Sequence, residues 1–89
     1  SIRDKIAKDF DGKIEVSNSN GRSDVESSDK VFEVKPISNW THGLGQVYTY
    51  SLATRKKPVL VLYGNCPPGE NILYACSTLN VEVMFFKLN

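Results

Sequence analysis

The stretch RSDVESSDKVFEVK, residues 22–35, carries the pattern that decides the fold. Two runs of alternating residues, 22–26 and 31–35, flank a polar segment at 27–30, and a period of two is typical of strands. A tight turn in that segment predicts an antiparallel hairpin. Pro36 has no N–H to donate to a ladder, so it should end the second strand.

The sequence on both sides of this hairpin alternates between helical and strand patterns. Apolar residues at spacings of three and four predict helices, and short alternating or apolar runs predict strands. The expected helices cover residues 2–10, 41–54 and 72–79, and the further strands cover 13–17, 59–63 and 81–88. Strands joined by short turns should pair antiparallel, and the later strands should follow right-handed parallel crossovers. We therefore predict an α/β domain of order αβββαβαβ with a mixed central sheet.

The composition is that of one small globular domain over residues 1–89. The chain is 40% hydrophobic and 24% charged, with a net charge of +1. Without a strong net charge, a surface for nucleic acid must be a local cluster of positive groups. The first residue is Ser rather than Met, which agrees with a piece of a larger parent protein.

Neither export nor membrane insertion is expected. The charged N-terminus SIRDKIAKDFDG lacks the apolar segment of a signal peptide, and the longest apolar run, 59–63, is too short to cross a bilayer. Cys66 and Cys76 are too few for a disulfide scaffold, so we interpret them as small buried residues in a reducing compartment. These features predict an intracellular protein of the cytoplasm or nucleus.

The predicted hairpin places like charges opposite each other. Pairing outward from the turn sets Asp24 against Glu33, and the period of two puts Arg22 and Lys35 on the same face. Opposed carboxylates destabilise a sheet by up to about 1 kcal/mol, which a divalent cation would offset. Such a metal could activate water for phosphodiester hydrolysis, with Lys35 stabilising the transition state. The alternative is an ordinary solvated strand face with mutual ion pairs.

Two motifs resemble those of a nuclease family. Asp24 followed by Glu33-Val34-Lys35 resembles the Asp…Glu-x-Lys signature of the PD-(D/E)XK, or restriction-endonuclease-like, nucleases. The spacing of Gln46 and Tyr50 is similar to the Gln-x-x-x-Tyr motif on the following helix in several clades of that superfamily. The resemblance covers nearly the whole chain. It implies a restriction-endonuclease-like αβββαβ core with an added αβ unit.

The resemblance also implies roles for individual residues. Asp24 and Glu33, with the backbone carbonyl of Val34, would bind Mg²⁺ or Mn²⁺. Lys35 would act at the attacking water or the scissile phosphate. The implied catalytic set is Asp24, Glu33, Lys35, Gln46 and Tyr50. In a departure from the family pattern, the first helix carries no Glu that could complete the metal site, and only Asp9 could substitute there.

The helix expected at 41–54 has two faces. Leu44, Val47 and Leu52 fall on an apolar stripe, whereas Gln46 and Tyr50 fall opposite it and should be free to face a cleft. The residues that we expect to contact nucleic acid are Arg22, His42, Gln46 and Arg55. His42 could instead belong to an exposed first turn, and Arg55 could simply favour the helix dipole.

The sequence thus predicts a Mg²⁺- or Mn²⁺-dependent deoxyribonuclease that hydrolyses DNA. The alternative is a catalytically inactive nucleic-acid-binding or assembly domain with the same fold. A domain of this size covers little duplex, so we expect a homodimer or attachment to a larger protein.

Overall fold

The computed structural model describes residues 1–88. Within them lie three helices, α1 (Ile2–Asp9), α2 (Trp40–Thr54) and α3 (Glu70–Thr78), and a short 3-10 turn, η1 (Ile37–Asn39). The strands are β1 (Lys13–Asn18), β2 (Gly21–Glu26), β3 (Lys30–Pro36), β4 (Lys57–Gly64) and β5 (Glu82–Lys87). The predicted order αβββαβαβ is confirmed.

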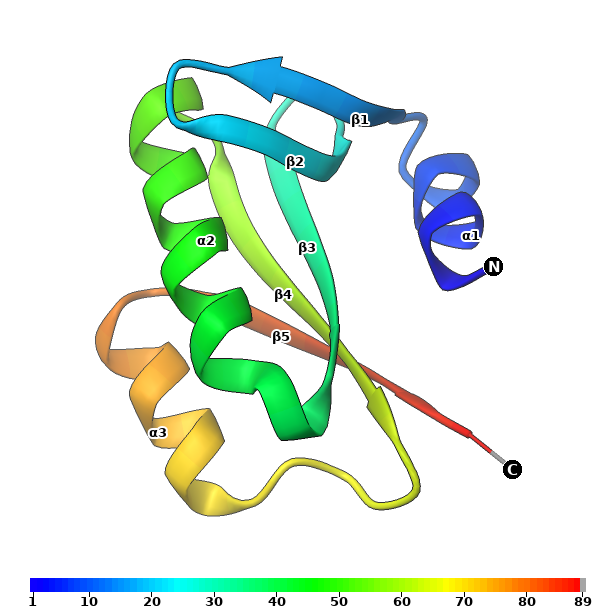
Figure 1. The fold of residues 1–89 in the computed structure, drawn as a ribbon, viewed down its shortest axis with the longest axis vertical. Helices are drawn as coiled ribbons and strands as arrows, with labels where there is room; N and C mark the ends of the chain where they lie inside the picture. Colours follow the sequence, from blue (N-terminus) through cyan, green and yellow to red (C-terminus); the bar gives the residue numbers. More distant parts are fainter. Residues whose placement is uncertain (89) are drawn as a thin grey trace.

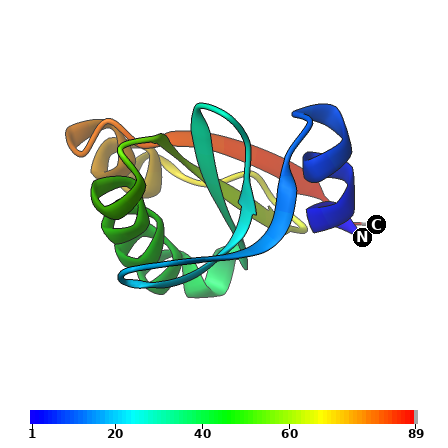
Figure 2. The same cartoon turned by 90° about the horizontal axis from the view of Figure 1, so that it is seen from above.

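The strands form one mixed sheet in the order β1-β2-β3-β4-β5. β1, β2 and β3 pair antiparallel, whereas β3, β4 and β5 pair parallel, as the turn lengths predicted. α2 and α3 cover one face of the sheet, and α1 lies on the other (Figures 1 and 2). The α/β class and the mixed central sheet are therefore confirmed.

The hairpin between β2 and β3 has the predicted register near its turn. Val25 pairs with Phe32, and Glu26 pairs with Val31. Beyond these pairs, bonds between side chain and backbone connect the two strands. Asp24 Oδ2 accepts from the Val34 N–H at 2.8 Å, and Glu33 Oε1 accepts from the Asp24 N–H at 3.4 Å. The two carboxylates thus lie where the strands separate.

An apolar core covers each face of the sheet. β4 contributes to both, because Val59 and Val61 face α1 whereas Leu60 and Leu62 face α2 and α3. All four side chains are fully buried, as expected for a continuous apolar strand covered on both sides. The core beneath α1 consists of Ile6, Val25, Phe32, Val59 and Val61.

The prediction for the faces of α2 is wrong at two positions. Tyr50 was expected to face a cleft, but it is only 6% exposed and belongs to the core. Leu52 was expected to be buried, but it is 64% exposed. The cause is a long-range contact: the β1–β2 turn reaches the second half of α2, where Asn20 Nδ2 donates to the Thr49 carbonyl at 3.1 Å. The hairpin therefore covers the helix face that carries Tyr50.

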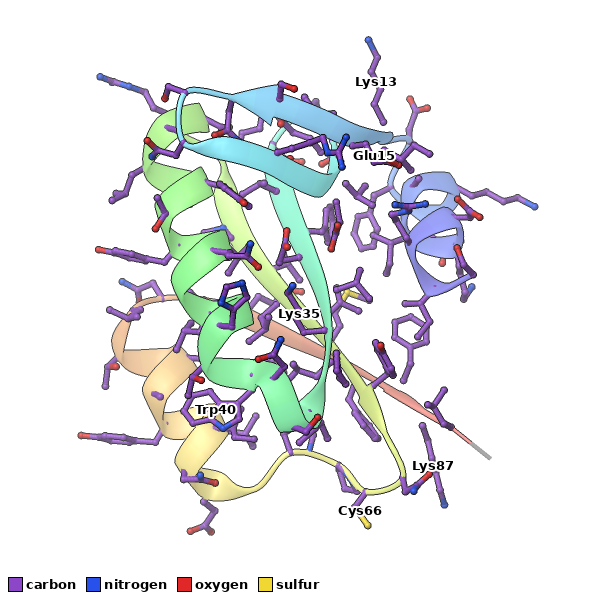
Figure 3. The ribbon with its side chains drawn as sticks, viewed as in Figure 1. Lys13, Glu15, Lys35, Trp40, Cys66 and Lys87 are labelled. Carbon is purple, nitrogen blue, oxygen red and sulfur yellow. The ribbon has the colours of Figure 1, made fainter. Side chains whose placement is uncertain are left out.

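The cysteines also differ from the prediction. Cys76 is buried, as expected, but Cys66 is exposed on the loop after β4, and both are free thiols. Figure 3 shows Cys66 projecting from that loop. Pro67 and Pro68 follow it directly in this loop. None of the helices within residues 1–88 is both long and apolar enough to span a membrane.

Candidate functional site

Five residues predicted for catalysis come together on three adjoining elements. Asp24 lies on β2, Glu33 and Lys35 lie on β3, and Gln46 and Tyr50 lie one turn apart on α2. Gln46 Nε2 donates to Tyr50 Oη at 3.4 Å. The Tyr50 phenol is close enough to both carboxylates for their charges to raise its pKa. The structure therefore places Tyr50 near both carboxylates, with Lys35 close to Glu33 and Gln46 bonded to Tyr50. Asp24 also lines a depression beside α1, together with Ser1 and Arg3. The catalytic roles of the five residues stay predictions.

Glu33 is the most buried ionisable group of this cluster, at 3% exposure. Burial, and next the nearby Asp24 carboxylate, raise the pKa of Glu33 from 4.5 to about 7. The Asp24 N–H and the Lys35 ammonium act in the opposite direction. Near neutral pH this carboxyl group therefore exists in both protonation states, which is unusual for Glu.

The buried side chain of Tyr50 lies between α2 and the β1–β2 hairpin. Burial first, and then the charge of Glu33, raise the pKa of its phenol, so the group is neutral and able to donate a hydrogen bond. Gly21 crosses directly over the ring with a φ of 142°. A Cβ at this position would lie 3.1 Å from Tyr50 Oη. Glycine is therefore required here by both the backbone angle and the close approach.

Lys35 passes between β3 and α2, where Figure 3 shows it. A Cβ on Gly43 would lie 2.7 Å from Lys35 Cγ and 2.8 Å from Leu60 Cδ1. Gly43 thus lets the helix pack closely on the sheet and on the lysine stem, which explains why a residue unfavourable in helices stands there. Gly45 differs, because a Cβ there would meet no atom within 4 Å.

A polar depression, called here the α2 hollow, lies between α2 and the β1–β2 turn. Its volume is about 500 Å³. Most of its lining carries hydroxyl, amide or imidazole groups, and the residues are Asn20, Thr41, His42, Gly45, Gln46, Thr49 and Tyr50. Gln46 Oε1 is buried and accepts no hydrogen bond within the described part of the chain. The α2 hollow therefore offers hydrogen-bonding groups to a ligand and has an unpaired buried acceptor beside it.

The residues expected to contact nucleic acid divide into two pairs. His42 and Gln46 line the α2 hollow, as predicted for a binding surface. Arg22 and Arg55 are exposed but do not line it. Arg22 Nη1 lies 3.5 Å from Glu15 Oε1, and Arg55 ends α2 with a φ of 58°. All four contacts with nucleic acid stay predictions.

The metal site predicted from the sequence is not supported. Within residues 1–88, no three His, Cys, Asp or Glu side chains lie close enough together to hold a metal ion. Asp9 does not complete one, because it is exposed on α1 and pairs with Lys5 at 2.9 Å. In the structure Asp24 and Glu33 each accept a hydrogen bond from a backbone N–H, and their role as metal ligands stays a prediction. That Mg²⁺ or Mn²⁺ is a cofactor, with the Val34 carbonyl as a ligand, stays a prediction.

Sequence reasoning missed the contribution of the β1–β2 turn. Asn20 lines the α2 hollow and bonds to the backbone of α2 beside Thr49, which also lines it. The turn itself was visible in the sequence as Ser17-Asn18-Ser19-Asn20-Gly21. Its position against α2 depends on the twist of the hairpin, which no local pattern encodes.

Comparison with known proteins gives two relatives from Acanthamoeba polyphaga mimivirus. Both are named as KilA-N domain-containing proteins. Protein L32 is 42% identical over 67 residues, which are 75% of this chain and 18% of that protein. Protein L33 is 35% identical over 63 residues, which are 70% of this chain and 26% of that protein. The chain thus spans about a quarter or less of these relatives. No family model and no solved structure matches it.

These relatives overturn the nuclease assignment. Both are named for a KilA-N domain, and neither is named as a PD-(D/E)XK nuclease. The predicted membership of that superfamily is therefore wrong. The function predicted from it, metal-dependent DNA hydrolysis, is wrong as well. Asp…Glu-x-Lys is a short pattern that charged hairpins produce for other reasons, here a pair of bonds between side chain and backbone. That the chain is an enzyme stays a prediction.

Proposed function

We propose that this chain is a DNA-binding domain whose contact surface is the α2 hollow. The KilA-N domain named in both relatives is a family of DNA-binding domains, which supports DNA as the partner. This is the alternative that the sequence left open, a nucleic-acid-binding domain without catalysis. The relatives are several times longer, so the proposal concerns this domain and not a whole protein.

The observation that carries the proposal is the lining of the α2 hollow. Its side chains are hydroxyl and amide groups and the imidazole of His42, and its lining contains no carboxylate. Such groups, with backbone N–H groups and helix N-termini, make many of the phosphate and sugar contacts to DNA. The exposed Arg22 lies on β2, the strand that follows the turn. Neutral donors with one exposed arginine nearby suit a phosphate backbone.

Gly45 makes the surface of α2 open to close approach. It lies on the exposed side of the helix and lines the α2 hollow. A glycine inside a helix costs about 1 kcal/mol relative to alanine, and no packing contact explains this one. A ligand backbone that approaches the helix closely would explain it.

The test is fluorescence anisotropy with labelled duplex and single-stranded DNA between about 50 and 200 mM salt. We expect affinity to fall as salt rises, because phosphate binding releases counterions. Arg22→Ala and Gln46→Ala should each weaken binding. Lys8→Ala is the matched control, since it removes an exposed charge from α1 on the opposite face. A folded protein that binds neither DNA at low salt would refute the proposal.

A further inference from the structure

The two edges of the sheet differ in how well they are protected. On β1, Glu15 has a φ of 54°, which interrupts the regular strand, and it pairs with both Arg3 and Arg22. Figure 3 shows Glu15 on this side, near α1. Charges and irregular backbone on an edge strand prevent pairing with other chains. β1 is therefore a protected edge.

β5 has none of these features. It pairs with β4 in unbroken register from Glu82 to Lys87, and it contains neither proline nor glycine. Its four central residues, 83–86, are apolar and partly exposed, and its charges stand only at its two ends. A regular apolar edge of this kind is a template for another strand.

The hydrogen-bonding groups on the free side of β5 can be assigned. The Leu88 N–H donates to the Gly64 carbonyl of β4 at 2.8 Å, so the amide of residue 88 points inward. Amide direction alternates along a strand. The N–H and C=O groups that point outward are therefore those of Val83, Phe85 and Lys87.

We propose that β5 pairs antiparallel with β5 of a second copy of this chain, centred on Phe85. A two-fold axis that joins two sheets edge to edge stands normal to the sheet, so each residue meets one on its own face. Phe85 then lies opposite itself, and Val83 lies opposite Lys87 of the second copy. These pairs use every outward amide. Centring on Met84 would leave the outward groups of Lys87 without a partner in the second β5.

The charges on β5 are compatible with this second copy. In the antiparallel pair Lys87 lies opposite Val83, and Glu82, which pairs with Lys30 of its own chain at 3.4 Å, lies opposite Leu88, so no like charges meet. A parallel pair in register would instead place Glu82 beside Glu82 and Lys87 beside Lys87. The net charge of +1 leaves little repulsion between two copies. On the α1 face, Met84 would lie opposite Phe86 of the second copy, a favourable sulfur–aromatic contact.

Helix α3 adds apolar surface near the same edge. It packs over β5 through Ile72 and Cys76, yet it leaves Leu73 45% and Tyr74 73% exposed. The two-fold axis keeps both α3 helices on one face of the joined sheet, where they flank the axis. It also keeps both α2 hollows on that face. Across the sheet the two Glu33 residues would be five strand spacings apart, about 24 Å, with a further offset of about 13 Å along the strands.

The test is sedimentation velocity of the 89-residue chain over a wide concentration range, without DNA. We expect a reversible dimer, and slower hydrogen exchange at Val83, Phe85 and Lys87 as concentration rises. Lys87→Pro removes one outward N–H from each strand and should weaken the dimer roughly tenfold. Lys87→Ala keeps that N–H and should leave the dimer unchanged.

Two results would overturn the inference. A folded monomer at every concentration would mean that a different occupant, such as a segment of a longer chain, covers β5. A dimer that Lys87→Pro weakens no more than Lys87→Ala would use a different surface. Because no DNA is present in these experiments, their outcome is separate from that of the proposed DNA binding.

Discussion

The two faces of the sheet differ in the kinds of side chain that they bury. The buried cluster beneath α1 is apolar, with Phe32 packed on Phe10 at a ring distance of 4.9 Å. The face beneath α2 is apolar near α3, but toward the hairpin it holds Glu33, Tyr50 and a buried Gln46 oxygen. A buried carboxyl group with a raised pKa lowers the stability of the folded chain. The apolar cluster beneath α1 must therefore supply much of the stability that the Glu33 side loses.

The strongest test of this contrast removes Phe32 from the α1 face. Phe32→Ala should lower the free energy of unfolding by about 3–5 kcal/mol, because it deletes a fully buried ring and leaves a cavity. Urea denaturation followed by circular dichroism measures the loss. Gln46→Ala on the other face is the comparison, and it should change stability by about 1 kcal/mol or less. Equal losses would contradict the assignment of stability to the α1 face.

Glu33→Gln tests the cost of the buried acid. The pKa of Glu33 is about 7 in the folded chain, raised from 4.5, so the folded state binds this proton more tightly than the unfolded state does. The stability that the proton contributes is complete below pH 4.5 and is lost as pH rises through 7. The loss is at most about 3 kcal/mol. Glu33→Gln should remove this part of the pH dependence and raise the melting temperature at pH 8.

Thermal unfolding between pH 5 and pH 8 measures the effect. Asp24→Asn is a useful second variant, because it removes the neighbouring charge that helps to raise the pKa of Glu33. It should therefore shift the pH-dependent loss of stability to lower pH. If wild type and Glu33→Gln lose stability equally between these pH values, then Glu33 does not titrate in the folded chain near neutral pH.

Gly21→Ala tests the crossing of the hairpin over Tyr50. Its φ of 142° is strained for any residue with a Cβ, and that atom would lie 3.1 Å from Tyr50 Oη. We expect a loss of about 1–3 kcal/mol, measured by urea denaturation. Gly45→Ala is the control, since its backbone is helical and a Cβ there would meet no atom within 4 Å. Weaker DNA binding by Gly21→Ala would further connect the hairpin position to the α2 hollow.

The sequence was sufficient for features that depend on neighbours along the chain. The polar turn at 27–30 sets the register of β2 and β3, and alternation from that turn is enough to place Asp24 near Glu33. The same local logic failed where distant segments meet. Tyr50 is buried and Leu52 is exposed because the β1–β2 turn covers one side of α2. No periodicity within α2 records that contact.

The chemistry of the site was harder to predict than its geometry. Asp24, Glu33, Lys35, Gln46 and Tyr50 do converge, but convergence does not name a reaction. A short motif was interpreted as a nuclease signature, which the names of the two relatives overturn. In the structure each carboxylate accepts a backbone N–H where the strands separate. These bonds connect β2 to β3 where the backbone pairing ends. They give the acid pair a structural role, which charge spacing alone does not distinguish from metal binding.

The smallest expected effect separates folding from binding on α2. The Cβ that Gly45→Ala adds would meet no atom within 4 Å. The variant should therefore stabilise the chain by about 0.5–1 kcal/mol, because alanine has a higher helix propensity than glycine. Gly43→Ala is the matched contrast, because its Cβ would lie 2.7 Å from Lys35 Cγ and should destabilise the chain. If DNA approaches α2 closely, Gly45→Ala should bind DNA more weakly while it unfolds at a higher temperature. A variant that gains stability and keeps full DNA affinity would show that the ligand does not approach α2 at Gly45.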